Sequence, residues 1–590
     1  MTEPYPFTQR IASIYNSGMS RVMVATGNVM DLFYSPELER YTHLLPYLEG
    51  KCRAMEKTTL VIWELNGPIR FISPDQQKLV EAAWNRWGGW PKAWPDQESG
   101  GEKTFPSLLL DAINSPTLAL ELLRQLCILS RSKDGEGLFL SQNLVIIIED
   151  ADLIIPAGDS FAQLPEKVQR RIKIMRDWLG DPAFHAGNDF LILLAESRSS
   201  LNSQVARLPT LLEVRIPLPS TEERRHYIEW FSGTLPAKPS YEGNLDSFSE
   251  ATAGFMLQTL GQLLRESASR KEVISAQRVT DAIEEQAKRQ LGEDVVTFKR
   301  PTHTLKDAQG NRLLKKFLSD VLIPAIRSRK HAPSAVTVSG ALGAGKTYIY
   351  EAVAGELGVP VVVLGNFRSM WFGQSDVIWE RLERFLTSFS QVVIFVDEAD
   401  TAFGGVGPDT HETERRLTGR FHALISDPAN RGRITAILMT ARVHLLSRDL
   451  LRPGRGGDYI LPVLDPEGED KTDFLRWVLA AAGIRKPSPA QLAELATMTT
   501  GGYAALFDQY RRRLAAAREN RKGKRLTWEQ LKNIVQDVVP PPLERVRRYQ
   551  TLQALLFCTS RSVLTPEQWD LRSNAHAEIR KLEAEGIRGF

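Results

Sequence analysis

The residues best suited to phosphate chemistry lie in the second half of the chain, in the run Gly340-Ala-Leu-Gly-Ala-Gly-Lys-Thr347. This run fits the phosphate-loop pattern G-x-x-x-x-G-K-[ST] at every fixed position. Its glycines leave room for backbone N–H groups to turn inward around a triphosphate. Lys346 is expected to reach the β- and γ-phosphates, and Thr347 to offer its hydroxyl to Mg²⁺. The expected cofactor-binding residues of the loop are Gly340, Ala341, Leu342, Gly343, Ala344, Gly345, Lys346 and Thr347.

An acidic pair supplies the second half of the expected chemistry. The apolar run Val392 to Val396 reads as a buried strand, and Asp397 and Glu398 follow it directly. A carboxylate just past a buried strand can hold the shell of Mg²⁺, which suits Asp397, with Thr347 as the other metal residue. The next carboxylate can polarise the attacking water, which suits Glu398.

These groups need a parallel sheet with helices to position them. Residues 335 to 339 (AVTVS) read as a buried strand before the loop, and 348 to 357 as a helix whose positive N-terminus faces the phosphates. In the first half, 21–25, 59–64, 143–148 and 189–195 read as buried strands, followed by helical segments at 221–230 and 258–267. The pattern predicts the α/β class, with ligand sites at the carboxyl ends of the strands.

The two halves of the chain contain corresponding segments at a nearly constant offset. Glu149-Asp150-Ala-Asp152 and Asp397-Glu398-Ala-Asp400 are 248 residues apart, and two further pairs of segments have the same or nearly the same offset. We interpret this as a duplicated module. The expected domains are a first module at 1–290 (α/β part 15–219, small α-helical lid 220–290), a second at 291–540 (α/β part 300–466, lid 467–539), and a helical C-terminal extension at 541–590.

The two modules differ chemically. No G-K-[ST] occurs before residue 300, and the turn after the first strand is only Thr26-Gly27-Asn28. The acidic pair is reversed, Glu149-Asp150 against Asp397-Glu398, so the first module is not expected to hydrolyse ATP. Whether it binds any nucleotide stays open. It also has four tryptophans at 84, 87, 90 and 94, which suit either a partner-binding patch or an insert held by its own aromatics.

Composition narrows the class of protein. The 590 residues are 43% hydrophobic and 25% charged, as in ordinary globular proteins, and suggest three to four domains. The three cysteines lie far apart, so neither a disulfide framework nor a zinc site is expected. With no long apolar run and no signal pattern, we expect a cytoplasmic protein that does not bind a membrane. A net charge of +3 gives no electrostatic case for nucleic acid.

At this point the second module resembles the AAA family of ATPases, most of all the valosin-containing-protein type. The phosphate loop, Val396-Asp-Glu-Ala-Asp400, Met370-Trp-Phe-Gly373 and Leu451-Arg-Pro-Gly-Arg455 carry the resemblance. It implies ATP hydrolysis in a homo-oligomeric ring, a hexamer, in which Arg452 and Arg455 are arginine fingers for a neighbour's ATP. It also implies a substrate-gripping pore loop at Trp371, Phe372 and Gly373, and an adenine pocket near Asp307 and Ala308.

The chain departs from the family at two places. Where the family usually has the asparagine that orients water, this chain has Ala441, with Thr440 beside it as a substitute through its hydroxyl. The lid motif Thr500-Gly-Gly-Tyr-Ala-Ala505 is a loose match. These departures leave slow hydrolysis open.

Two functions follow for such a protein. The preferred one is an ATPase that remodels or threads a protein substrate, in the manner of a chaperone. The alternative is a slow nucleotide-gated scaffold or switch that assembles a partner complex. The arginines at 511–513 and the run 518–525 suit either a nucleic-acid patch or a solvated helix face, and the role of the helical tail after Pro540-Pro-Pro542 stays open.

Overall fold

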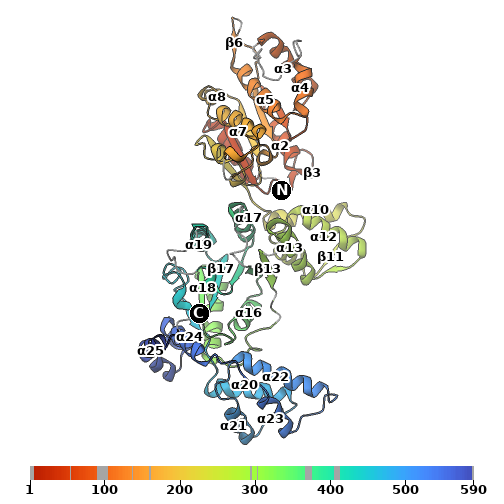
Figure 1. The fold of residues 1–590 in the computed structure, drawn as a ribbon. Coiled ribbons are helices and arrows are strands. Elements are labelled where there is room, and N and C mark those ends of the chain that lie inside the picture. The colour runs from red at the N-terminus through yellow and green to blue at the C-terminus, as the bar shows by residue number, and fades with distance from the viewer. Residues whose placement is uncertain are drawn as a thin grey trace. The chain divides into compact units, whose positions relative to one another are not determined.

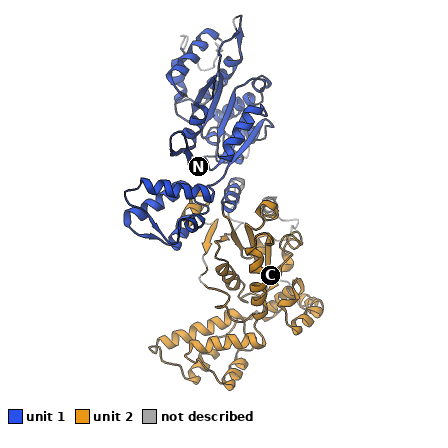
Figure 2. Cartoon of the chain, turned by 180° about the vertical axis from the view of Figure 1, so that it is seen from behind, with its two compact units in different colours: residues 1–283, 374–388 blue, residues 284–373, 389–590 orange. Residues whose placement is uncertain are grey.

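A computed structural model gives the fold, and it describes residues 5–53, 55–88, 104–135, 137–158, 161–292, 295–299, 301, 303–365, 375–403 and 412–587. The chain divides into two units (Figure 2). Unit 1 is Met1–Ile283 with Gln374–Ser388, and unit 2 is Glu284–Gly373 with Phe389–Phe590. Each unit has its own six-stranded sheet and its own hydrophobic clusters (Figure 1).

The sheet of unit 1 has the strand order β10-β1-β9-β8-β4-β5. All its pairs are parallel except β4 with β5. The strands are β10 (Leu211–Ile216), β1 (Val22–Gly27), β9 (Phe190–Leu194), β8 (Asn143–Ile148), β4 (Thr58–Trp63) and β5 (Arg70–Phe71). Three two-stranded pairs accompany it: β2 (Leu32–Ser35) with β3 (Arg40–His43), β6 (Lys133–Asp134) with β7 (Gly137–Leu138), and β11 (Ser240–Tyr241) with β12 (Val273–Ile274).

Helices surround this sheet and continue into a helical lid. The helices of the α/β part are α1 (Pro6–Ser17), α2 (Leu44–Arg53), α3 (Pro74–Trp87), α4 (Phe105–Ile113), α5 (Pro116–Arg131), α6 (Ala151–Ile154), α7 (Glu166–Leu179), α8 (Pro182–Ala186) and α9 (Ser203–Ala206). The lid has α10 (Thr221–Thr234), α11 (Leu245–Ala251), α12 (Leu257–Arg270) and the first part of α13 (Ala276–Leu291), whose residues from Glu284 onward belong to unit 2. Contacts also assign α17 (Ser375–Thr387) to unit 1, where Arg381 pairs with Glu196.

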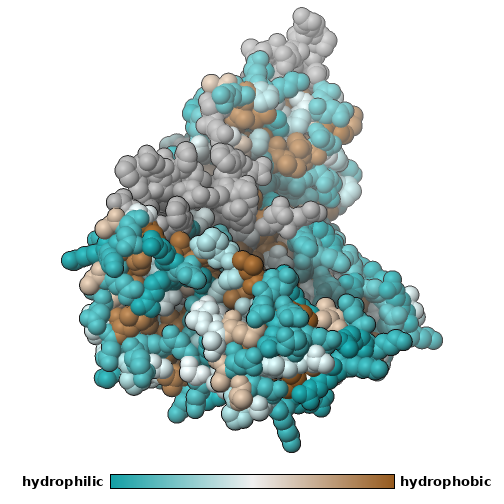
Figure 3. Space-filling view, turned by 60° about the horizontal axis from the view of Figure 1, so that its bottom comes forward, coloured by the Kyte–Doolittle hydropathy of each residue, from teal (hydrophilic) through white to brown (hydrophobic). Residues whose placement is uncertain are grey.

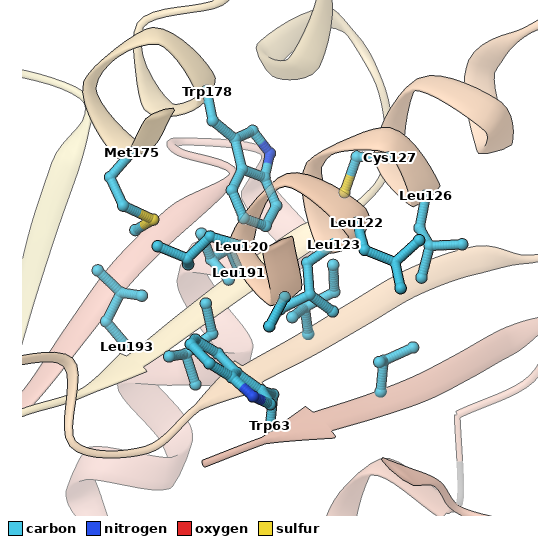
Figure 4. Packing of buried hydrophobic residues seen from close by; sticks show 14 of the residues in the cluster. Trp63, Leu120, Leu122, Leu123, Leu126, Cys127, Met175, Trp178, Leu191 and Leu193 are labelled. Carbon is cyan, nitrogen blue, oxygen red and sulfur yellow. The ribbon is translucent and has the colours of Figure 1, made fainter. Parts of the chain in front are cut away.

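Both faces of the unit 1 sheet are buried. Alternate residues of one strand belong to two different clusters: Val61 and Trp63 of β4 pack in one, and Leu60 and Ile62 in the other. This division explains why the strands read as continuous apolar runs, as expected for a parallel sheet covered on two sides. Figure 4 shows one side, where leucines of α5 lie against Trp63 and strand β9, with Trp178 and Met175 of α7 beside them.

Two of the four tryptophans of the insert lie in the described residues. Trp84 is buried in the core cluster, 5.2 Å from the ring of Phe105, and Trp87 packs beside it at 5.6 Å. For these two the structure favours an insert held by its own aromatics over a partner-binding patch. Trp90 and Trp94 lie outside the described residues.

The sheet of unit 2 has the order β13-β15-β16-β17-β14-β18. Only β13 is antiparallel to its neighbour. The strands are β13 (Val296–Lys299), β15 (Val361–Leu364), β16 (Val392–Val396), β17 (Ile434–Thr440), β14 (Ala335–Ser339) and β18 (Ile460–Pro462). Matched from the strand that precedes the glycine turn, the five parallel strands have the same spatial order in both units. The expected α/β class, with a parallel sheet in each half, is confirmed.

The helices of unit 2 form three groups. Around the sheet lie α14 (Arg312–Phe317), the π-helical stretch Leu318–Leu322, α15 (Ile323–Arg327), α16 (Lys346–Leu357), α18 (Ala399–Ala402) and α19 (Glu412–Ser426). The lid has α20 (Gly468–Ala481), α21 (Pro489–Met498), α22 (Ala504–Glu519) and α23 (Trp528–Gln536), and the C-terminal extension has α24 (Glu544–Phe557) and α25 (Pro566–Ala584). Ser488 with Gln491, and Thr527 with Gln530, form capping boxes that start α21 and α23.

The surface of the lid of unit 2 is mostly polar. Figure 3 shows a face on which hydrophilic residues predominate and hydrophobic ones are scattered. The three arginines at 511–513 of α22 are paired: Arg511 and Arg512 with Asp508, and Arg513 with Asp537. For Arg512 and Arg513, whose side chains are 68% and 43% exposed, this pairing favours a solvated helix face over a nucleic-acid patch. Among the described helices, none has the length and apolarity needed to cross a bilayer.

Candidate nucleotide site

The phosphate loop joins β14 to α16 through glycines that the backbone requires. Gly340 has φ +153°, and a Cβ there would lie 2.2 Å from the carbonyl oxygen of Val463 at the end of β18. Gly345 has φ +94° and precedes the first helical residue, Lys346. The loop therefore turns tightly against the neighbouring strand and opens onto the N-terminus of a 12-residue helix.

Lys346 folds back over the loop it belongs to. Its Nζ donates to the carbonyl oxygens of Gly340, at 2.8 Å, and Ala341, at 3.2 Å. Burial lowers the pKa of Lys346 from 10.5 to about 8, and the nearby carboxylate of Asp397 opposes this shift. The lysine charge is thus poorly solvated at the loop, which is the position where phosphate oxygens would compensate it.

The acidic pair stands at the carboxyl end of β16. Glu398 has φ +47° and precedes α18, and its backbone N–H donates to Asp397 Oδ1 at 2.9 Å. This left-handed turn directly after a fully buried strand brings both carboxylates out of the sheet, and both are exposed. A strained non-glycine residue at a strand end is typical of functional sites.

One cavity of about 870 Å³ brings most of the predicted residues together. Its walls include the following predicted residues: Asp307, Ala308, Leu342, Gly343, Ala344, Gly345, Lys346, Thr347, Asp397, Glu398 and Thr440. Gly340 and Ala341 lie at the base of the loop and are not among the wall residues. Arg452 and Arg455 are not among them either, and both lie near Asp449. Trp371, Phe372 and Gly373 lie outside the described residues.

Part of the cavity wall is apolar. Ala308, Ile349, and Phe474 and Trp477 of the lid helix α20 are among its residues, and such side chains suit the faces of a purine base. The carboxylate of Asp307 bonds within its own turn, where Oδ2 accepts from the N–H and the hydroxyl of Thr304 at 2.8 and 3.0 Å. These hydrogen bonds lower the pKa of Asp307.

The end of β17 carries a polar network that the sequence did not reveal. Thr440 Oγ1 donates to Asp400 Oδ1 at 2.5 Å, and Arg442 Nε donates to Asp400 Oδ2 at 2.5 Å. The Thr440 oxygen also accepts from the Arg442 N–H at 2.8 Å. A hydroxyl has one proton, so in this arrangement Thr440 has none left to donate to a water. Asp400 and Arg442 were not predicted as site residues from the sequence. Asp400 was noted only as the end of the acidic run, and no sequence motif includes Arg442.

Unit 1 has a similar glycine turn, but different side chains lie beside it. Gly27 has φ +104°, and a Cβ there would lie 2.4 Å from the carbonyl oxygen of Ile216, as at Gly340 and Val463. Asp31, which is 0% exposed, then accepts from Asn28 Nδ2 at 2.9 Å and from the N–H groups of Leu257 and Gln258 at 3.0 and 3.2 Å. The carboxylate thus lies at the N-terminus of lid helix α12, although burial raises its pKa.

The acidic run of unit 1 has a similar backbone turn and a different electrostatic environment. Asp150 has φ +50°, as Glu398 has +47°. Burial raises the pKa of Glu149 and of Asp150, with the nearby carboxylate of Glu64 adding to both shifts. Asp152 accepts from the Glu196 N–H and the Ser200 hydroxyl, so it ties β8 to the end of β9 as Asp400 ties β16 to β17.

Comparison with known proteins matches regions in the two halves of the chain to two different family models. Residues 336–461 match the model of the ATPase family associated with various cellular activities (AAA). Residues 336–461 are an AAA ATPase domain. The expected enzyme class, ATP hydrolysis, is confirmed by this match. Residues 3–217 match the model of the N-terminal Rossmann-like domain of AAA+ chaperones.

Several curated proteins resemble parts of the chain. The ATP-dependent zinc metalloprotease FtsH of Mesomycoplasma conjunctivae is 27% identical over 41% of this chain and 33% of its own length. That of Thermus thermophilus is 28% identical over 42% of this chain and 41% of its own. The human ATPase family gene 2 protein homolog A is 29% identical over 29% of this chain and 19% of its own. The matched regions thus span 33% and 41% of the length of these two bacterial relatives, and the protease in their name is a property of those proteins.

Proposed function

We propose that unit 2 binds ATP with Mg²⁺ and hydrolyses it, and that unit 1 has no catalytic role. The single observation that carries the proposal is the cavity where the phosphate loop, Lys346, Asp397 and Glu398 meet. In unit 1 the corresponding turn has no lysine and holds the carboxylate of Asp31 instead. Like charges repel, so a triphosphate is disfavoured there.

The roles proposed for the site follow from its layout. The N–H groups at 343–347 and the N-terminus of α16 would hold the phosphates, with Lys346 against the β- and γ-phosphates. Glu398 would act as the base that polarises the attacking water. Asp307 and Ala308 would border the base, which Phe474 and Trp477 would cover.

The residues present fit Mg²⁺. The hydroxyl of Thr347 and the carboxylate of Asp397 both border the cavity, and hard oxygen donors with room for water and phosphate are what this ion prefers. When bound, Mg²⁺ would neutralise charge on the phosphates during transfer.

Arg452 and Arg455 are proposed to serve a neighbouring subunit of a homo-oligomeric ring, a hexamer by the family resemblance. Arg452 is 70% exposed in its side chain and lies on a loop outside its own cavity, which is where a group acting in trans would be placed. AAA proteins typically oligomerise, and the number of subunits is part of the proposal.

For the whole protein we propose remodelling or threading of a protein substrate. The support is the chaperone-type domain at 3–217 joined to an AAA domain. The tandem origin of the two modules, the domain limits predicted above, the valosin-containing-protein likeness and a cytoplasmic location belong to the same proposal. The matching strand orders of the two sheets support the first of these.

One observation favours the alternative, a slow nucleotide switch. Ala441 has no group to orient water, and Thr440 donates its proton to Asp400. An ATPase lacking this orienting contact would turn over slowly and spend most of its cycle bound to ATP.

ATPase assays with an unfolded protein separate the two functions. A remodelling enzyme is stimulated by substrate, and Trp371→Ala with Phe372→Ala removes that stimulation while basal turnover and assembly stay nearly intact. ATP-dependent assembly with negligible stimulated turnover supports the switch. Normal substrate processing by the double variant rules out threading through this loop.

A further inference from the structure

Helix α24 of the C-terminal extension contacts the phosphate loop directly. Gln550 Oε1 accepts the N–H of Leu342 at 3.0 Å, across a sequence separation of 208 residues. Gln550 is 3% exposed and forms part of the cavity wall. This bond occupies the loop N–H at 342 and leaves the following stretch of the loop facing the cavity.

Arg547, one helical turn earlier on α24, joins three parts of unit 2. It is 6% exposed, and its Nη2 donates to Asp465 Oδ1 at 2.5 Å, just after β18. Its guanidinium carbon lies 3.7 Å from the ring centroid of Tyr503, at the start of lid helix α22. That ring in turn lies against the loop, since a Cβ on Gly343 would be 3.0 Å from it.

Arg547 also brings a buried donor to the site, although its charge is paired with Asp465. Its Nη1 is buried and has no hydrogen-bond partner among the described residues. The guanidinium is near enough to Lys346 for the two positive charges to interact. A buried donor without a partner is costly, so such a group is usually retained for a ligand or a function.

The position of α24 is set by packing rather than by these two residues. Leu555 is buried in the core cluster of the α/β part, Tyr549 donates to Glu583 of α25 at 3.0 Å, and Arg548 pairs with Glu578. Substituting Gln550 or Arg547 therefore removes a contact to the loop or the lid while the apolar face of the helix stays docked.

We propose that Gln550 and Arg547 are positioning residues for the nucleotide, through which α24 holds the phosphate loop and the lid in the geometry that binds a nucleoside triphosphate. This inference rests on the nucleotide site proposed above. It gives the C-terminal extension a function: its contacts with the phosphate loop and the lid support the affinity of unit 2 for ATP.

The test is titration of the full-length protein with a fluorescent ATP analogue and Mg²⁺, together with thermal unfolding in the absence of nucleotide. We expect Gln550→Ala to weaken binding about fivefold, the size of one neutral hydrogen bond. Arg547→Met should weaken it about tenfold or more, because a charge is lost, and Arg547→Lys should restore most of the affinity. The matched control is Arg545→Ala, an arginine of the same helix that is 72% exposed and pairs with Glu585.

Each outcome decides the matter. Wild-type affinity in Gln550→Ala and Arg547→Met, with binding lost in Lys346→Ala, overturns this inference and leaves the nucleotide site standing. Equal losses in Arg547→Met and Arg547→Lys, with both proteins unfolding earlier than Arg545→Ala, assign the arginine a structural role and also overturn it. Absence of binding in the wild type refutes the nucleotide site, and the inference with it.

Discussion

The glycine turns at the ends of β1 and β14 resemble each other in backbone and differ in what lies beyond the glycine. Gly27 and Gly340 both have positive φ and both face a carbonyl oxygen of the adjacent strand, of Ile216 and Val463 respectively. Beyond the glycine, unit 2 has a lysine and an open cavity, whereas unit 1 has a buried aspartate bonded to its lid.

The lids of the two units bond differently to these turns. In unit 2 the start of α22 borders the cavity, and the Ala505 N–H donates to Gly343 O at 3.0 Å. In unit 1 the start of α12 donates two N–H groups to Asp31. A helix N-terminus favours a negative group, and unit 1 carries one in its own chain. Unit 1 therefore joins its lid to its glycine turn through a carboxylate of its own chain, and the two units are expected to respond differently to the same substitutions.

The largest expected difference concerns the acidic pairs. Glu398→Gln should reduce ATP hydrolysis about 10³- to 10⁴-fold while ATP stays bound, because the general base is lost but the phosphate contacts remain. Lys346→Ala should abolish binding itself. Phosphate release and nucleotide retention measure the two effects. The matched control is Glu149→Gln in unit 1, which should leave the rate unchanged; a comparable loss there would mean that both units are catalytic.

The arginines after β17 come next. Arg455→Ala should reduce hydrolysis roughly 10³-fold if it stabilises charge on the phosphoryl group of a neighbour's ATP. Mixing Arg455→Ala with Glu398→Gln protein should recover part of the activity, since some interfaces then combine an intact arginine with an intact glutamate. Unchanged rates in preassembled Arg452→Ala and Arg455→Ala proteins would show that neither arginine acts on ATP.

The carboxylate of Asp31 in unit 1 should contribute to the stability of the protein and not to catalysis. Asp31→Ala removes the acceptor of the buried Leu257 N–H and of the part-buried Gln258 N–H, at a cost of about 2–4 kcal/mol in the free energy of unfolding. Denaturant unfolding of unit 1, followed by its tryptophan fluorescence, is the measurement. Asp246→Ala, at an exposed aspartate of the same lid, is the control and should cost little. An unchanged midpoint in Asp31→Ala would show that the lid is held by its apolar contacts alone.

The smallest expected effect comes from substituting the glycine that both turns share in position. Gly27→Ala and Gly340→Ala each place a Cβ against a carbonyl oxygen, at 2.4 and 2.2 Å, and should each destabilise their own unit by about 1–3 kcal/mol. Only Gly340→Ala should also weaken ATP binding. Gly50→Ala, in α2 with no atom within 4 Å of the added Cβ, is the control. Loss of nucleotide binding in Gly27→Ala would point to a working site in unit 1.

Much of the fold and part of the site were predictable because their signals are local. The strand Asn143–Ile148 was predicted at its observed limits, and the helix after the phosphate loop begins only two residues before its predicted start. Runs of buried aliphatic residues report a sheet covered on both faces, whatever lies far along the chain. The phosphate loop and Asp397-Glu398 are likewise contiguous motifs, and the cavity includes most of their residues.

Other features depend on residues that meet only after folding. Gln550 reaches Leu342 from 208 positions away, and Asp31 meets the start of α12 across 226 positions. Arg442 and Thr440 converge on Asp400 from the next strand of the sheet. No spacing rule relates such residues, because one hydrogen bond between distant segments leaves no periodic pattern in the chain. The contiguous motifs alone located the predicted phosphate site. Only the tertiary structure shows which distant side chains border that site, and that in unit 1 the carboxylate of Asp31 lies beside the corresponding turn.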